Sequence, residues 1–486
     1  MTSTLDETAA RPEAATRRPR VVVIPTARPT FVVEEARARA ANARALLDEL
    51  GADVVGPVDL VMTPEDVESA RAYFTDDVDI VINVCASFSD ATPAIELYST
   101  LDRPLVTWSF REPGPVGDRL WLNSLCGSNL YGHALARAGR DVRLVYGDPG
   151  EPELRDTLTQ LLAGNYPAPP ELQRQHHPRA DEGPVQAGLQ RLQGATIGVI
   201  GEAPPGFTPS QFDPDLIKGV FGLTYDPITI EETFDRIDAV PSATTEAELT
   251  ALRSDRPSVG GLKQDEVAKH AAVTSAFRDW QQVSDLSAIA VRCWPEFPSQ
   301  RGVCPCSSLS RLADEGTPTV CERDVYGAVT MLLMEALGSG TTYLVDTVDL
   351  DADRNVVRLW HCGAAATSLA AEPDDATQFV HCNRKLGVAG NFPLKTGPVI
   401  MARLTEDNIG EGTSGLRLLL GSGVSVPAPN RFQGNTADVE LDIDATSFVH
   451  SLVHQGFPHH TVLAWTDVRP QLRTAADLLG IPVVEW

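Results

Sequence analysis

Two acidic residues in the middle of the chain are spaced so that they could bind a divalent ion together. Glu322 lies in Cys321-Glu322-Arg323-Asp324-Val325, where a helix is expected to begin, and Asp346 closes the apolar run Tyr343-Leu344-Val345. The two are 24 residues apart in a helix-then-strand pattern, so both carboxylates can reach one edge of a sheet, where α/β proteins usually bind ligands. Oxygen ligands of this kind beside a histidine suit Mn²⁺ or Mg²⁺.

The histidine could come from the segment Phe457-Pro458-His459-His460 near the C-terminus. Each of these pieces also has an ordinary explanation when taken alone. Glu322 can be a helix cap or a partner of the helix dipole, Asp346 can start a turn, and a histidine pair beside proline is common in surface turns. Their occurrence together favours a metal site.

Composition sets the broad class of the protein. A chain of 486 residues is expected to form two or three domains, and 43% apolar with 22% charged residues is typical of a soluble globular enzyme. The net charge of −26 argues against binding to nucleic acid or to an anionic membrane surface. No apolar run approaches the roughly 20 residues of a membrane-spanning helix, and no signal sequence is recognisable, so a cytoplasmic protein is expected.

The cysteines and glycines carry little information at this level. Eight irregularly spaced cysteines in so long a chain indicate reduced thiols rather than a disulfide framework. Cys304-Pro305-Cys306 is too closely spaced for a zinc knuckle or a redox pair of the usual kind. Neither of the first two predicted domains contains a G-x-G-x-x-G turn, so a dinucleotide cofactor is not indicated.

The predicted fold class is α/β, with two doubly wound parallel-sheet domains and a C-terminal β-barrel-like domain. Residues 1–19 lack an apolar pattern and are predicted to be a disordered leader. Strand-like runs alternate with helical stretches over 20–165, and 166–193 has the composition of a linker. A second α/β domain is expected over 194–350, carrying the two carboxylates. Short β-rich runs over 351–486 predict a barrel or sandwich that carries the histidine pair.

This order of domains, together with the acidic helix start, the later aspartate and the histidine pair, resembles the L-fucose and L-arabinose isomerase family. The match extends over most of the chain from about residue 20. The segments that carry the resemblance are Trp108-Ser109-Phe110-Arg111-Glu112-Pro113-Gly114, Cys321 to Thr330, Tyr343 to Asp349, His361-Cys362-Gly363 and Gly456-Phe457-Pro458-His459-His460. The chain is more similar to the fucose-type branch, because Asp346 stands where arabinose isomerases usually carry Glu.

The resemblance implies metal-dependent interconversion of an aldose and a ketose through a cis-enediol or enediolate. Mn²⁺, with Mg²⁺ or Co²⁺ as alternatives, would be held by Glu322, Asp346 and one residue of the histidine pair. Neighbouring residues on an extended strand face opposite ways, so we expect only one to bind, and we choose His460. Glu322 and Asp346 would also carry the proton between the two carbons. His361 and His459 are expected to contact the sugar, and His361 also matches a region that supplies a further ligand in the arabinose branch.

The resemblance further implies a homo-oligomer, because family members often complete the sugar pocket with the N-terminal domain of a neighbouring subunit. By analogy Arg28 would reach a substrate oxygen and Phe88 or Trp108 would form a wall, although both aromatic residues also suit a protein core. Cys85-Ala86-Ser87-Phe88-Ser89 departs from the aromatic-rich segment expected there, which leaves the sugar open among deoxy-hexoses, pentoses and modified hexoses. An extra positive charge, Arg28 or Arg301, predicts an anionic sugar such as a sulfonated hexose.

Two other classes of function are compatible with the same residues. A metal-dependent sugar aldolase or lyase would share the enediolate chemistry, and a non-catalytic sugar-binding protein would share the frame. The intact set of carboxylates and histidines favours the isomerase.

Overall fold

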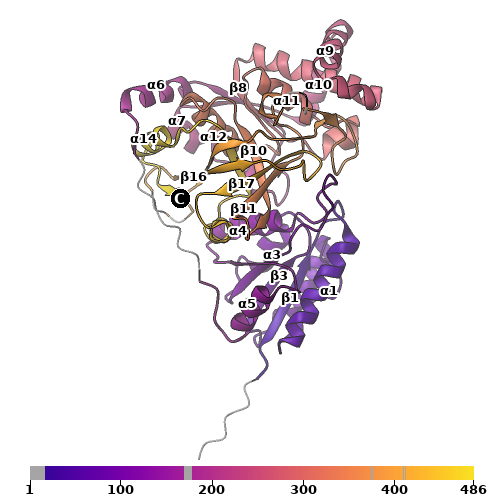
Figure 1. Cartoon of the computed structure of the whole chain (residues 1–486), viewed down its shortest axis with the longest axis vertical. Helices are drawn as coiled ribbons and strands as arrows, with labels where there is room; N and C mark the ends of the chain where they lie inside the picture. Colours follow the sequence, from indigo (N-terminus) through magenta and orange to yellow (C-terminus); the bar gives the residue numbers. More distant parts are fainter. Residues whose placement is uncertain (1–16, 169–177, 373, 375, 409, 411) are drawn as a thin grey trace, which may run out of the picture.

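The computed structural model describes residues 17–168, 178–372, 374, 376–408, 410 and 412–486. Most of the predicted leader and part of the predicted linker therefore lie outside the described residues. In Figure 1 the N-terminal sheet and its helices form one end of the molecule, and the remaining elements form the other. The helices α9 and α10 project from that second end, on the side away from α6 and α14.

The N-terminal end is a five-stranded parallel sheet in the order β2-β1-β3-β4-β5. Its strands are β1 (Arg20–Thr26), β2 (Asp53–Val55), β3 (Ile80–Cys85), β4 (Leu105–Ser109) and β5 (Arg143–Tyr146). The helices between and after them are α1 (Val33–Glu49), α2 (Pro64–Ala70), α3 (Thr92–Tyr98), α4 (Ser124–Arg137) and α5 (Pro152–Leu162). The central strand β3 is buried at every position, as a parallel strand covered on both faces must be. The predicted doubly wound fold is confirmed here.

A second parallel sheet has four strands in the order β7-β6-β8-β9. They are β6 (Thr196–Ile200), β7 (Thr224–Ile228), β8 (Leu286–Val291) and β9 (Thr319–Val320). Its helices are α6 (Glu182–Leu192), α7 (Pro214–Phe221), α8 (Ile230–Asp238), α9 (Ser242–Asp255), α10 (Gln264–Val283), α11 (Cys306–Asp314) and α12 (Val325–Ala336). The helix α12 is apolar almost throughout, because it lies between this sheet and the next one.

The third sheet has eight strands in the order β14-β17-β11-β10-β18-β15-β16-β19, and a further pairing between β16 and β17 joins six of them in a ring. The strands are β10 (Tyr343–Asp351), β11 (Val356–His361), β14 (Phe392–Pro393), β15 (Gly397–Glu406), β16 (Leu416–Val426), β17 (Asn435–Leu441), β18 (His460–Ala464) and β19 (Val483–Glu485). A small separate sheet pairs β12 (Gln378–Phe379) with β13 (Ala389–Gly390), and the helices are α13 (Ala445–His454) and α14 (Arg469–Leu479).

The strand that carries Asp346 differs from its prediction in two ways. We expected it to belong to the second α/β domain and to end at Asp346, whereas β10 continues to Asp351 and pairs with β11 and β18 of the third sheet. The reason is that the ladder with β11 resumes after a register shift between Thr347 and Asp349, where the acidic Asp349 pairs with Arg358 of β11. Asp346 is therefore an interior strand residue and does not begin a turn.

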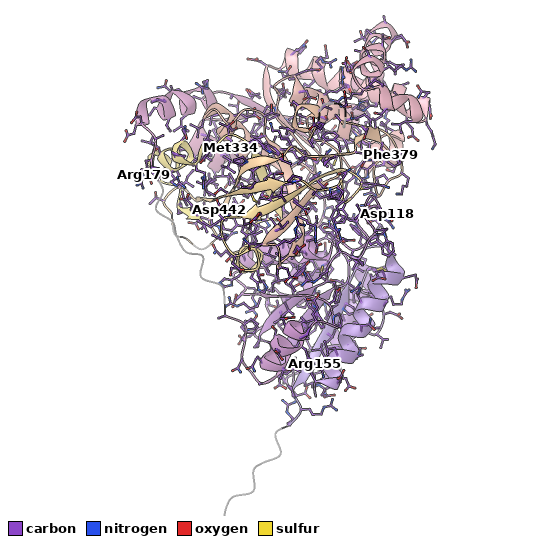
Figure 2. All side chains as sticks on the ribbon, viewed as in Figure 1. Asp118, Arg155, Arg179, Met334, Phe379 and Asp442 are labelled. Atoms are coloured by element: carbon purple, nitrogen blue, oxygen red, sulfur yellow. The ribbon has the colours of Figure 1, made fainter. Side chains whose placement is uncertain are left out.

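Side chains fill the space between the three sheets (Figure 2). Met334 of α12 is fully buried, while Arg155 and Phe379 lie on the outside. Among the described residues, no helix combines the length and the apolar character needed to cross a membrane.

Candidate metal centre and sugar pocket

Glu322 sits in a strained turn between β9 and α12. Both Glu322 and Arg323 have positive φ angles, 61° and 59°, a region that costs a residue other than glycine roughly 1–3 kcal/mol. The Arg323 side chain holds the turn by donating to the backbone oxygens of Gly201 (2.5 Å) and Ser210 (2.9 Å). The Glu322 carboxylate in turn accepts a hydrogen bond from the Trp294 indole at 3.2 Å. Helix α12 begins after Glu322, with Asp324 as its N-cap, so Glu322 is not the helix cap.

Asp346 and His460 are direct neighbours across two antiparallel strands. They are register partners on β10 and β18, which brings residues 114 positions apart in the chain together in space. His460 Nε2 lies 3.3 Å from Asp346 Oδ1 and 3.4 Å from Glu322 Oε2. The structure thus brings together the three residues that we expected to form the metal site.

A buried ion pair orients His460 from behind. Asp324 Oδ2 lies 2.7 Å from His460 Nδ1, and both Asp324 oxygens receive the Arg403 guanidinium, at 2.5 and 2.9 Å. All three side chains are completely buried. Burial alone would raise the pKa of Asp324, but Arg403 and then His460 lower it, so the carboxylate stays ionised. Metal-binding histidines usually have such an acceptor on the second ring nitrogen, which leaves the first free to bind an ion.

The atoms that face the centre of this group fit a divalent ion. His460 Nε2 and Asp346 Oδ1 are buried and have no hydrogen-bond partner among the described residues, and the same holds for His361 Nε2. The ligand atoms of Asp346, His361 and His460 lie within 4.8 Å of one another. Adjacent ligands of an octahedral ion with bonds of about 2.1 Å are about 3 Å apart, close to the 3.3 and 3.4 Å seen here.

His459 lies on the same side as His460, contrary to our expectation that neighbours on a strand face opposite ways. The two ring centres are only 4.2 Å apart. The reason is that β18 begins at His460, and His459 belongs to the bend before it, where strand alternation does not apply. Burial lowers the pKa of His459 well below its usual value, and His460 lowers it further, so the ring is neutral. It packs edge-on against Phe88 and Phe207.

His361 is the last residue of β11 and faces both the carboxylates and a group of cysteines. Its Nδ1 accepts the backbone N–H of Cys362 at 3.0 Å, while its Nε2 points toward Asp346 and His460. An imidazole whose Nδ1 accepts a hydrogen bond carries its proton on Nε2. In that form His361 is a donor toward the centre of the site, which agrees better with sugar binding than with metal ligation.

A cavity opens beside these ligands, and the N-terminal sheet contributes to its wall. Its lining residues are Arg28, Thr30, Phe31, Phe88, Asn123, Trp294, Glu322, Asp346, Trp360, His361, Cys362, His381, Asn383, Arg384 and His459. The resemblance implied that a neighbouring subunit supplies Arg28 and Phe88, whereas here the same chain supplies both.

Two arginines meet at this cavity around one indole ring. The guanidinium carbon of Arg28 lies 4.6 Å from the centre of the Trp294 ring, and that of Arg384 lies 5.9 Å from it. Within the described part of the chain, neither guanidinium has a carboxylate within 4.0 Å. Burial lowers the pKa of Arg28, Asp90 opposes that shift, and Arg384 adds to it. Two neighbouring cations without an anion between them make this end of the cavity suited to a negative group.

Two other expected residues lie elsewhere. Trp108 is completely buried in the core of the N-terminal end and donates to the Gly147 backbone oxygen, so it does not line the cavity of its own chain. Arg301 pairs with Asp238 at 2.9 Å, away from the cavity. The prediction that these two contact the sugar therefore finds no support in the geometry.

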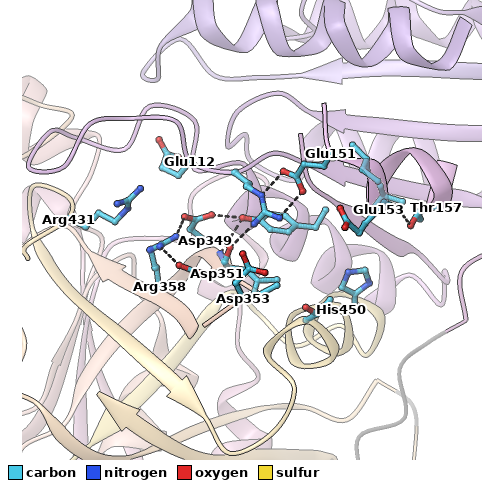
Figure 3. Close-up of a pocket in the computed structure, with 17 residues that line it drawn as sticks. Glu112, Glu151, Glu153, Thr157, Asp349, Asp351, Asp353, Arg358, Arg431 and His450 are labelled. Carbon is cyan, nitrogen blue, oxygen red and sulfur yellow. Dashed lines mark hydrogen bonds and ion pairs between the residues drawn. The ribbon is translucent and has the colours of Figure 1, made fainter. Parts of the chain in front are cut away.

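A larger cavity of roughly 850 Å³ lies between the N-terminal end and the third sheet (Figure 3). Two of its arginines are already paired, Arg111 with Glu151 at 2.5 Å, and Arg358 with Asp349 at 2.6 Å and Asp351 at 3.0 Å. Burial raises the pKa of Glu112, at its edge, to about 7. Because the cavity lacks the convergent, unpartnered ligand atoms of the first one, we assign the chemistry to the smaller cavity.

Sequence reasoning missed Asp324, Arg403 and Arg384. Asp324 precedes a helix as any N-cap residue does, and nothing in the sequence distinguishes a cap that also orients a histidine. Arg403 lies in an otherwise apolar part of β15 and is fully buried. An arginine within an apolar strand was the signal in the sequence, because a buried arginine needs a carboxylate partner. Arg384 lies in a segment without periodic structure.

Comparison with known proteins gives a consistent result. Residues 359–486 match the family model of the L-fucose isomerase C-terminal domain. A sulfoquinovose isomerase from Alkalicoccus urumqiensis is 32% identical over 471 residues, which cover 96% of this chain and 99% of the relative. Sulfoquinovose isomerases from Priestia megaterium and a Clostridium species are 30% and 29% identical and cover 95% of this chain and 98% of the relative in each case.

Proposed function

The chain belongs to the L-fucose isomerase-like family and is a sugar aldose-ketose isomerase, and from this premise we propose that its substrate is sulfoquinovose or a closely similar sulfonated hexose. We further propose that the reaction needs a divalent ion held by Glu322, Asp346 and His460. The relatives are named for sulfoquinovose, a hexose whose C6 carries a sulfonate.

The observation that carries the substrate proposal is the pair Arg28 and Arg384, both next to the Trp294 ring. Both line the cavity that contains Glu322 and Asp346. A sulfonate has three acceptor oxygens, and guanidinium groups bind such oxo-anions with charge-assisted hydrogen bonds. A neutral sugar would leave both guanidinium groups without an ion-pair partner, whereas a sulfonated sugar supplies one. Asn383, beside Arg384, offers a further amide donor.

The residues at the other end of the cavity support the isomerisation. When bound, a divalent ion would act as a Lewis acid on the oxygens of the two carbons between which the proton moves. Glu322 is held by the Trp294 indole, and Asp346 lies between two histidine rings, so each carboxylate has a fixed position from which to take a proton from one carbon and return it to the next. His361 and His459 present ring nitrogens that can bond the sugar hydroxyls.

The surroundings also exclude bulk water from the reacting carbons. Phe88, Phe207 and Trp360 pack around the histidines, and all three are at most 7% exposed. A dry environment strengthens the electrostatic contribution of the carboxylates and hinders loss of the transferred proton to solvent.

The test uses the full-length protein stripped with EDTA and reloaded with Mn²⁺, Mg²⁺ or Co²⁺. Sulfoquinovose, glucose, L-fucose and L-arabinose are each incubated in D₂O, and ketose formation and deuterium at the reacting carbons are followed by NMR. We expect metal-dependent ketose formation with sulfoquinovose strongly preferred, and its loss in Glu322→Gln. Equal rates on neutral and sulfonated sugars would overturn the substrate proposal, and release of a shorter aldehyde would identify an aldolase instead.

A further inference from the structure

Six of the eight cysteines gather in one buried cluster beside the proposed active site. They are Cys293, Cys304, Cys306, Cys321, Cys362 and Cys382, and none is more than 8% exposed. They come from separate parts of the chain: the segment after β8, the start of α11, the end of β9, the segment after β11 and the loop after β12. We call this group the thiol cluster. The proposed isomerisation uses none of these sulfurs.

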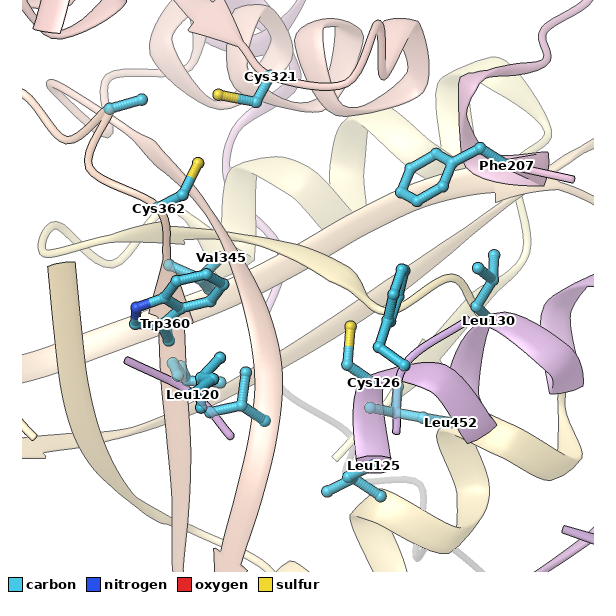
Figure 4. Close-up of a cluster of buried hydrophobic side chains, with 14 of the residues drawn as sticks. Leu120, Leu125, Cys126, Leu130, Phe207, Cys321, Val345, Trp360, Cys362 and Leu452 are labelled. Carbon is cyan, nitrogen blue, oxygen red and sulfur yellow. The ribbon is translucent and has the colours of Figure 1, made fainter. Parts of the chain in front are cut away.

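Within the thiol cluster, three side chains converge as metal ligands do. The ligand atoms of Cys306, Cys362 and His381 lie within 4.8 Å of one another, and so do those of Cys321, His361 and Cys362. Cys362 belongs to both groups and so lies at their centre. Figure 4 shows the sulfurs of Cys321 and Cys362 turned toward each other across the gap between their segments.

The sulfur positions match a shared ion better than a disulfide. The Cys306 and Cys362 sulfurs are 3.9 Å apart. Two thiolates on a tetrahedral zinc ion with bonds of about 2.3 Å would be about 3.8 Å apart, whereas a disulfide requires about 2.05 Å. Buried cysteines that serve only as small apolar side chains have no reason to meet an imidazole.

We propose that the thiol cluster binds one thiophilic divalent ion of the zinc type, through Cys306, Cys362 and His381. Sulfur and imidazole ligands select zinc or cadmium, while the carboxylates of the sugar site select manganese, magnesium or cobalt. The chain thus holds two metal sites that differ in ligand chemistry. Each cysteine binds as a thiolate, so its proton is released to solvent on binding.

His361 connects the two sites. Its Nδ1 lies 3.3 Å from the Cys362 sulfur, and its Nε2 belongs to the group formed with Asp346 and His460. An ion on Cys362 would fix the loop after β11 and with it the ring of His361. In this arrangement the zinc-type ion is structural and positions His361, and it takes no part in the reaction itself.

The ligands of this site are too far apart in the sequence to form a recognisable motif. Cys304-Pro305-Cys306 is too closely spaced for a zinc knuckle, but only Cys306 of that segment is a ligand. The other two ligands follow 56 and 75 residues later, at Cys362 and His381, a spacing that matches no zinc motif.

The test measures metal binding and does not depend on sugar turnover. Reduced full-length protein is dialysed against Zn²⁺ and Mn²⁺ together, and each metal is counted by mass spectrometry. Co²⁺ bound to the zinc-depleted protein is followed by its thiolate-to-cobalt absorption. The variants are Cys306→Ser and His381→Gln, with Cys85→Ser as the control, because Cys85 is equally buried but lies in the N-terminal sheet.

We expect one zinc per chain and a thiolate-to-cobalt band in the wild type and in Cys85→Ser. Cys306→Ser is expected to lose the band and the zinc while keeping its Mn²⁺, and Glu322→Gln is expected to show the reverse. Circular dichroism establishes that each variant is folded, and His381→Gln serves if Cys306→Ser is not. A wild-type protein without the band, an unchanged band in both cluster variants, or a Cys306–Cys362 disulfide in place of the ion would overturn the proposal.

Discussion

Asp324→Asn is expected to weaken metal binding although Asp324 is not itself a proposed ligand. The reason is that Asp324 orients the proposed ligand His460. In the wild type one Asp324 oxygen serves both Arg403 and His460, and the other serves Arg403 and the Gly327 backbone N–H. Arg403 and the Gly327 backbone N–H donate to Asp324, and His460 Nδ1 also acts as a donor toward it. The amide nitrogen of Asn would place a donor against a donor on one side, and the charge that holds His460 in its ligating form would be lost.

Two separate costs follow, and the structure gives the size of each. Loss of the group that supports a metal-binding histidine typically weakens metal affinity by about 10- to 100-fold. Breaking the fully buried pair of Asp324 with Arg403 leaves an unpaired guanidinium, which costs about 3–5 kcal/mol of unfolding free energy. The double variant Asp324→Asn with Arg403→Gln removes the unpaired charge, so it should recover part of the stability but none of the metal affinity.

The assay combines Mn²⁺ titration by calorimetry with urea unfolding in EDTA, for the wild type, both single variants and the double variant. The reasoning requires that affinity stays low in the double variant while stability rises above that of Asp324→Asn. If Asp324→Asn binds Mn²⁺ as tightly as the wild type, Asp324 supports the fold only. If the double variant regains both properties together, the loss of affinity was a consequence of instability.

Three further changes test other parts of the structure. Arg384→Gln removes a charge-assisted hydrogen bond worth about 1.5–3 kcal/mol, so kcat/KM for the sulfonated sugar should fall about 10- to 100-fold while kcat/KM for glucose changes little; equal losses would contradict the sulfonate assignment. Burial lowers the pKa of His270 to about 3, so between pH 6.5 and 4.5 almost only the unfolded chain binds this proton, and the free energy of unfolding should fall by roughly 2.3 kcal/mol over that range on this account. Urea unfolding of His270→Gln at both pH values should show a smaller decline, and an equal decline would refute it. A Cβ at Gly421 would lie 1.7 Å from the Trp486 ring, so Gly421→Ala should lower the free energy of unfolding in urea by about 1–3 kcal/mol or more. The control is Gly150→Ala, whose Cβ meets no atom within 4 Å and which should cost under about 0.5 kcal/mol.

The sequence allowed the elements of the site to be predicted, but not their connections. Glu322, Asp346 and His460 could be singled out because a carboxylate or histidine beside an apolar run is a local signal. Their meeting depends on which strands pair, and the pairing of β10 with β18 joins parts of the chain more than 100 residues apart. For this reason Asp346 was expected at a strand end, although it lies in the middle of β10.

The same limit applies to the histidine pair and to the cysteines. Strand alternation predicted opposite directions for His459 and His460, and it failed because the strand begins between them. The residues that orient the site are harder still to identify, because Asp324 and Cys306 also have ordinary roles as a helix cap and at a helix start. Only the packing of distant segments distinguishes such residues from the many helix caps and helix-start residues that have no role in a site.

The three sheets contribute different parts of the chemistry, and this arrangement explains why the site needs all of them. Glu322 follows a strand of the second sheet, Asp346 and His460 lie on the third, and Arg28 follows the first strand of the N-terminal sheet. The proposed ion would therefore tie the second sheet to the third, and a sulfonated sugar that reaches Arg28 would tie the N-terminal sheet to both. Because a ligand that binds only the assembled form stabilises it, metal and substrate together should stabilise the docking of these parts more than either does alone. A site divided in this way is formed only when the whole chain has folded.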